Sequence, residues 1–224
     1  MDRALAVLGA ALPEMSGDEL AALSVGERDA CLLTLRETTL GPALACYVEC
    51  PVCAEQLEFT TTVGEVRVLP ALQRVPHEHT LRADGFELRF RLLTSRDLAS
   101  LAGARDVEAA RGLLLRRCVL DAAREGEPVP VEELPETVVA SLAAEMAERD
   151  PQAEVTFNLD CPRCSHAWVS AFDVVAFFWT ELSALAKRLL AEVHVLARAY
   201  GWREADILAM SSARRRAYLE LLGG

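Results

Sequence analysis

Two short cysteine motifs constrain this chain more than any other feature of its sequence. Cys50-Pro-Val-Cys53 and Cys161-Pro-Arg-Cys164 share the pattern CPxC, and each is followed by a segment rich in apolar residues. Two residues between cysteines let both thiolates of one motif face a single ion, and two such motifs complete a four-thiolate tetrahedron. The pattern therefore predicts one structural zinc ion, bound by all four cysteines, that joins two distant parts of the chain.

The gap between the motifs is long for a zinc ribbon, in which about 15–20 residues separate the two pairs. A long gap adds little to the cost of closure, because the loop entropy grows with the logarithm of length. The additional cost is on the order of 1–2 kcal/mol. A structural zinc ion contributes roughly 10 kcal/mol or more to folding. Metal binding therefore outweighs the cost of the gap.

Two other interpretations of the motifs stay open at this level. Each motif can be a reduced, buried structural pair, or a redox dithiol, although redox motifs sit between a strand and a helix. Cys46 is a rival ligand beside the first motif, and His166 is a fifth candidate beside the second. A catalytic zinc ion is disfavoured, because catalytic sites keep an open position and use histidine or carboxylate ligands.

Composition and charge exclude several classes of protein. The 224 residues are 52% hydrophobic, with much alanine and leucine, as in a globular protein rich in helix. The net charge of −11 argues against nucleic acid or an anionic membrane as the partner. No stretch of about 20 apolar residues is free of charge, so we expect no transmembrane helix. The N-terminus is expected to form a helix rather than a signal peptide, which predicts a cytoplasmic protein.

The distribution of helix and strand signals predicts an α+β protein. Two helices are expected between Asp2 and Thr39, one over residues 95–125, and a long one from Val174 to Tyr200. Strands are expected at Gln56–Val63, on both sides of an Asp84-Gly85 hairpin turn, and on both sides of the second cysteine motif. A further helix, residues 135–150, precedes that motif.

The predicted architecture has a zinc-ribbon-like centre, an insertion and two helical ends. Residues 1–42 are the N-terminal helices. Residues 43–70 and 154–173 form the centre, and residues 71–153 are the inserted hairpin and helices. Residues 174–224 are a C-terminal region in which the long helix is followed by a helix–turn–helix.

No motif supports an enzymatic function. The sequence lacks the glycine-rich loops of nucleotide-binding proteins and the signatures of metalloproteases and hydrolases. His77 and His79 are interpreted as residues of a solvated loop rather than as metal ligands. We expect no catalytic residue, no organic cofactor and no small-molecule substrate.

The C-terminal helix–turn–helix contains the candidates for a partner surface. Three consecutive arginines, Arg214 to Arg216, suggest a DNA-binding helix, but the acidic chain favours an amphipathic helix with solvated arginines. Aromatic residues and arginine are favoured at binding hot spots. The candidate contact residues are Trp202, Ile207, Leu208, Arg214 and Tyr218.

Three segments carry a resemblance to a known family. ERDACLLTLRETTLG precedes the first CPxC motif, SHAWVSAFDVVAFFWTEL follows the second, and EVHVLARAYGWREADILAMSSARRRAYLEL lies near the C-terminus. In these segments the chain resembles the T-even-type baseplate hub assembly chaperones of contractile phage tails and phage-tail-like injection systems. The resemblance is strongest from Cys161 to Leu221 and weakest between Leu69 and Glu154.

The resemblance implies a non-enzymatic assembly factor that binds hub or neighbouring baseplate proteins of a contractile tail-like particle. The two CPxC motifs match the cysteine pattern of this family in tail-like injection systems, and no catalytic residue is carried over. Two other functions stay open. One is a permanent minor subunit of the baseplate, and the less favoured one is a zinc-ribbon adaptor that binds nucleic acid.

Overall fold

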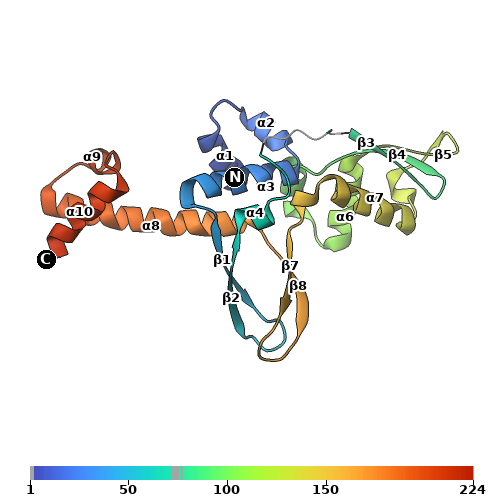
Figure 1. Cartoon of the computed structure of the whole chain (residues 1–224). Coiled ribbons are helices and arrows are strands. Elements are labelled where there is room, and N and C mark those ends of the chain that lie inside the picture. Colours follow the sequence, from blue (N-terminus) through green and yellow to red (C-terminus); the bar gives the residue numbers. More distant parts are fainter. Residues whose placement is uncertain (1–2, 72–75, 77, 224) are drawn as a thin grey trace. The chain divides into compact units, whose positions relative to one another are not determined.

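The computed structural model describes residues 3–71, 76 and 78–223, which combine helices with short antiparallel sheets (Figure 1). This arrangement confirms the predicted α+β class. The chain divides into two compact units, Met1–Val175 and Ala176–Gly224. The finer division into four segments stays a prediction.

Three helices open the first unit, where the sequence predicts two. The predicted cap is confirmed, because the Ser16 hydroxyl accepts a hydrogen bond from the Glu19 backbone N–H at 3.2 Å. A second cap of the same kind, Ser24 with Glu27, starts a new helix just beyond the first. The predicted second helix is therefore two helices. The three are α1 (Arg3–Ala11), α2 (Gly17–Ala22) and α3 (Val25–Leu40).

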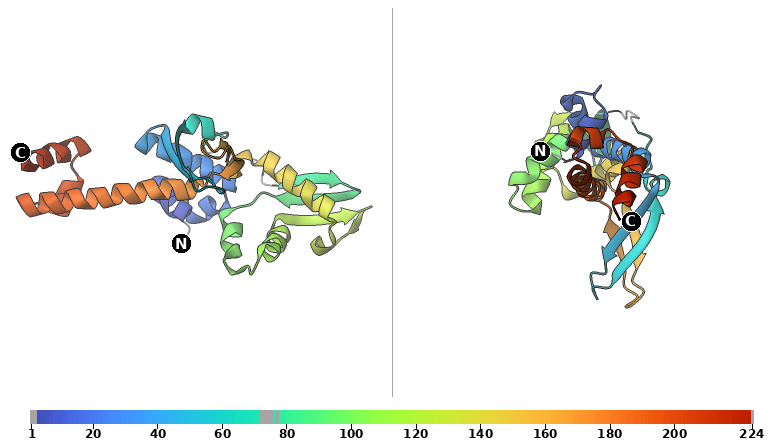
Figure 2. Two further views of the ribbon diagram at one scale, coloured as in Figure 1. Left: turned by 90° about the horizontal axis from the view of Figure 1, so that it is seen from below. Right: turned by 90° about the vertical axis from the view of Figure 1, so that its left-hand side faces the viewer.

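Two β-hairpins carry the cysteine motifs. In the first, β1 (Ala43–Glu49) pairs with β2 (Gln56–Thr62), and in the second, β7 (Thr156–Asp160) pairs with β8 (Ala167–Ala171). Strand β1 is not among the predicted strands, and Val63 begins the short helix α4 (Val63–Val66) rather than ending a strand. The two hairpins project side by side from the first unit, with their cysteine turns at the far end (Figures 1 and 2).

The inner faces of the two hairpins pack against each other. Burial alternates along all four strands, as expected when one face of each hairpin is covered. Phe59 of β2 meets Phe157 of β7 edge to face, with ring centroids 5.2 Å apart, and Phe157 also contacts Phe172. A hairpin of two strands is marginally stable alone, so this contact stabilises both.

The inserted region forms a four-stranded antiparallel sheet in the order β3-β4-β5-β6. The predicted turn is confirmed, because Asp84 and Gly85 both have positive φ, 49° and 80°, as a tight hairpin turn requires. The prediction of helix beyond Cys118 is wrong, because that segment pairs with β4 as a strand. The strands are β3 (Glu78–Ala83), β4 (Phe86–Arg91), β5 (Val119–Arg124) and β6 (Glu127–Pro128).

Three helices accompany this sheet, and the core lies between it and α7. Leu88 and Phe90 of β4 pack in one buried cluster with Val138 and Leu142 of α7. The helix predicted over residues 95–125 is broken after Ser100 and resumes with Asp106 as its N-cap. The helices are α5 (Ser95–Ser100), α6 (Val107–Cys118) and α7 (Glu136–Arg149), with short 3-10 turns at Leu101–Gly103, Val131–Glu133 and Pro151–Ala153.

One buried carboxylate ties β4, α5 and α6 together. Asp97 is fully buried and accepts hydrogen bonds from Arg91 at 2.6 Å and from Arg117 at 2.7 Å. It also accepts the backbone N–H of Thr94 at 2.9 Å and so caps α5. Burial alone would raise the pKa of Asp97, but these hydrogen bonds outweigh it and hold the pKa well below its usual range.

The second unit contains most of the long helix and two short ones. The long helix has the predicted bounds, and Gly201, at φ 69°, ends it. Val193, Leu196 and Ile207 form the buried core of this unit. Across the described part of the chain, no helix combines the length and the apolar character needed to cross a membrane. The helices are α8 (Val174–Tyr200), α9 (Glu204–Leu208) and α10 (Ser212–Gly223).

The substitution Asp97→Ala should lower the free energy of unfolding by about 3–5 kcal/mol at neutral pH, because two partly buried arginines lose their shared partner. Urea unfolding of the full chain measures this. The folded pKa of Asp97 lies below its unfolded value of about 3.9. Its contribution is therefore complete above that pH and is lost as the pH falls further.

Asp121→Ala is the matched control, because Asp121 is exposed on β5. It should change the free energy of unfolding by less than about 0.5 kcal/mol. Equal losses in the free energy of unfolding for the two substitutions would contradict the role assigned to Asp97. The role would also be contradicted if the difference between the two losses did not shrink as the pH falls below about 3.9.

Candidate metal centre

Each cysteine motif forms the turn of its hairpin, and the two turns share one hydrogen-bond pattern. In the first turn, the Cys50 N–H donates to the carbonyl of Glu55 at 2.9 Å, and the Ala54 N–H donates to the carbonyl of Cys50 at 3.0 Å. The equivalent bonds from Cys161 and Ser165 in the second turn are both 2.9 Å. Ala54 and Ser165 both have φ 57°. The repeated CPxC sequence thus folds into two equivalent turns.

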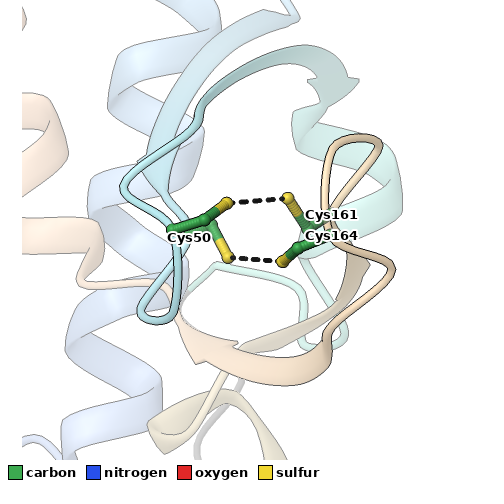
Figure 3. A group of neighbouring side chains, drawn as sticks. Cys50, Cys161 and Cys164 are labelled. Carbon is green, nitrogen blue, oxygen red and sulfur yellow. Dashed lines mark hydrogen bonds between the residues drawn. The ribbon is translucent and has the colours of Figure 1, made fainter.

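The two turns bring the four cysteine sulfurs together. The Sγ atoms of Cys50 and Cys164 are 3.7 Å apart, and those of Cys53 and Cys161 are 3.6 Å apart (Figure 3). All four lie within 4.8 Å of one another, and all four cysteines are free rather than disulfide-bonded. Four thiolates at about 2.3 Å from a tetrahedral zinc ion lie about 3.8 Å apart. The cluster therefore fits a single tetrahedral ion, while the identity of the metal stays a prediction.

Backbone N–H groups surround the sulfurs. The N–H of Glu55 donates to Cys53, and the N–H of His166 donates to Cys164, at the same position of each motif. Cys161 accepts from the N–H groups of Arg163 and Cys164. Hydrogen bonds of this kind stabilise the thiolate, which is the form that binds metal.

The pKa values of Cys161 and Cys53 are shifted in opposite directions. Burial raises the pKa of Cys161, but the surrounding N–H donors outweigh it, and the pKa falls to about 7. The N–H of Glu55 favours ionisation of Cys53, but burial and the three neighbouring thiols raise its pKa to about 12. Four adjacent thiols cannot all ionise by themselves, because like charges repel. A divalent cation supplies the positive charge that four thiolates need.

Other sequence candidates lie outside this cluster. Cys46 is buried on the inner face of β1, and the His166 ring stacks on Trp168 with centroids 6.0 Å apart. Among the residues that the structure describes, the ligand cluster consists of the four motif cysteines. His79 was expected in a solvated loop but lies in β3 with its ring against Phe90. His77 lies outside the described residues.

The five residues predicted to bind a partner differ in how far they are exposed to solvent. Trp202 and Tyr218 are partly buried in an aromatic cluster, with ring centroids 4.8 Å apart. Ile207 was expected on the contact surface but is fully buried in this unit, and its role in binding stays a prediction. Leu208 and Arg214 are exposed, and their role in binding stays a prediction.

We expect the purified protein to hold one zinc ion per chain, and Cys53→Ser combined with Cys164→Ser should release it. Serine hydroxyls ionise too weakly to replace thiolates as ligands. Elemental mass spectrometry measures the metal content. Cys46→Ala is the control, because Cys46 is a buried cysteine outside the cluster. Loss of metal from the control, or no metal in the unaltered chain, would contradict the site.

Comparison with known families identifies a match over most of the chain. The family described as "T4 bacteriophage base plate protein" matches residues 8–179, about three quarters of the sequence. The matched range contains both cysteine turns and ends within α8. Comparisons with curated proteins and with solved structures gave no match.

Proposed function

This chain belongs to the T4 bacteriophage base plate protein family, and we propose that it is a non-enzymatic factor that assembles the baseplate hub of a contractile tail-like particle. Its partners would be hub or neighbouring baseplate proteins, met in the cytoplasm of the producing cell. The observation that supports this most is the family match, which covers both cysteine turns and the helices between them.

We further propose that the four cysteines hold a structural zinc ion. Four sulfur ligands in a tetrahedral arrangement favour zinc or an iron–sulfur centre. The site has four thiols within 4.8 Å, the number that fills the coordination sphere of one zinc ion. A filled sphere leaves no open position for a catalytic water, which supports a structural and non-enzymatic role.

The metal would stiffen the two projecting hairpins. They pack through Phe59 and Phe157 between the strands, and the cysteine turns meet at their far end. An ion pair between Arg163 and Glu55, at 3.3 Å, also joins the two turns. A clamped pair of hairpins loses little conformational freedom when a partner binds, and this lowers the cost of association.

A permanent subunit of the baseplate is the second candidate, and the family description supports it equally well. Whether the protein is present in mature particles distinguishes an assembly factor from a permanent subunit. We expect a tagged full-length chain to co-purify with baseplate proteins from assembly intermediates and to be absent from finished particles, measured by quantitative mass spectrometry of both fractions. A fixed copy number in finished particles would instead establish a subunit.

The metal site should be necessary for assembly. Replacing the native gene by one that encodes Cys53→Ser and Cys164→Ser should reduce the yield of complete particles, counted by electron microscopy, at least about tenfold, because unclamped hairpins bind partners more weakly. The Cys46→Ala control should retain the yield. Normal yield from a chain that has lost its metal would contradict a structural role for the ion in assembly.

A further inference from the structure

The outer face of the β1–β2 hairpin is exposed and acidic. Its residues alternate with the buried ones along both strands, and every outward residue is exposed. Tyr47 lies directly opposite Glu58 in the strand register, and Glu49 is the next outward residue of β1. No lysine or arginine occurs between Arg36 and Arg67. We call Tyr47, Glu49 and Glu58 the tyrosine platform.

Tyr47 differs from the other two tyrosines of the chain. Its side chain is 57% exposed, whereas Tyr200 and Tyr218 pack on each other and on Trp202. An exposed aromatic ring with one carboxylate opposite it and another two residues along its strand matches the chemistry of an arginine side chain. The guanidinium stacks on the ring and forms hydrogen-bonded ion pairs with the acids.

The second unit carries the complementary charge. The chain as a whole has a net charge of −11, but residues 176–224 contain seven lysines and arginines against five acidic residues. Three of these arginines are consecutive in α10. Arg215 pairs with Glu192 at 2.9 Å. Arg214 and Arg216 are exposed and form no ion pair within the described part of the chain, although the Arg214 guanidinium lies 5.8 Å from the Tyr218 ring centroid.

An apolar side chain lies on the same side of α10 as one of these arginines. Leu221 is 72% exposed and follows Arg214 by seven residues, which is two helical turns. Residues at this spacing share a helix face, so α10 presents an arginine and a leucine together. The arginine can pair with the carboxylates of the platform, and the leucine can pack on its tyrosine ring.

We propose that α10 of one copy binds the tyrosine platform of a second copy. The surfaces are different, so the contact is head-to-tail and leaves a free platform at one end and a free α10 at the other. Such contacts produce rings when they close and filaments when they do not. The contact is small and its charges are exposed, so the association is weak and is screened by salt. This proposal does not depend on the proposed role in baseplate assembly.

Sedimentation velocity on the full-length, metal-loaded protein tests this. Association should increase with protein concentration and weaken at least about tenfold between about 50 mM and 500 mM salt. Glu49→Arg with Glu58→Arg, and separately Arg214→Glu with Arg216→Glu, should each abolish it. An equimolar mixture of these two variants should associate again, because one supplies an intact α10 and the other an intact platform.

Control substitutions distinguish the loss of the contact between α10 and the tyrosine platform from the effect of a changed net charge. Glu14→Arg with Glu148→Arg makes the same change in net charge at two exposed residues outside the platform and should leave association unchanged. Tyr47→Phe should retain association and Tyr47→Ala should weaken it, because only the ring is needed for stacking. Unchanged metal content and circular dichroism establish that each variant is folded.

Several results would overturn the proposal. One is a chain that stays monomeric at every concentration and salt. Another is a control variant that loses association as fully as the platform variant, and a third is a mixture that fails to restore it. Salt-dependent compaction of a monomer would show that α10 binds the tyrosine platform of its own chain. That result would also overturn the proposal, because the platform would then not bind a second copy.

Discussion

The first unit depends on the meeting of two hairpin turns that lie more than a hundred residues apart in sequence. Each hairpin has only two strands and one buried face, which is too little to hold its shape by itself. Phe59 and Phe157 join the hairpins along their length, and four sulfurs converge at the end. Each turn places its two thiols on the side that faces the other turn, so all four sulfurs lie together.

A second set of buried polar contacts joins the end of the inserted region to α3 and to the segment after α4. The carboxylate of Asp150, just after α7, accepts the Gly26 backbone N–H of α3 at 3.0 Å. A Cβ atom at position 26 would lie 1.9 Å from this carboxylate, so only glycine allows the approach. The fully buried Gln152 then accepts the Val68 backbone N–H and donates to the Val66 carbonyl. These contacts place β7 where it can pair its hairpin with the first one.

The charges of the chain are distributed by unit rather than evenly. The first unit carries the acidic excess, and one exposed sheet face within it combines two carboxylates with a tyrosine. The second unit has a small basic excess. Among its described residues, Val193, Leu196 and Ile207 form a small buried cluster, and several large apolar side chains are exposed. A small core with exposed leucines is typical of a module that gains stability from a partner.

The sequence by itself determined the elements that rest on contacts within a few residues. These are the Ser16 cap, the Asp84-Gly85 turn, the paired CPxC motifs and the full length of α8. Each follows from hydrogen bonds or periodicity that neighbouring residues specify. The hypothesis that the four cysteines share one site also came from spacing and residue type alone.

Only the tertiary structure decided the secondary structure or burial of segments that contact residues far away in the sequence. Strand β1 was not predicted and pairs along its whole length with β2, and β5 leaves its predicted helix to pair with β4. Ile207 is apolar and could lie on a surface or in a core, and packing against α8 places it in the core. The exposure of Tyr47 follows from β1 in the same way. Local sequence cannot specify these outcomes, because the contacts that stabilise them come from segments folded elsewhere in the chain.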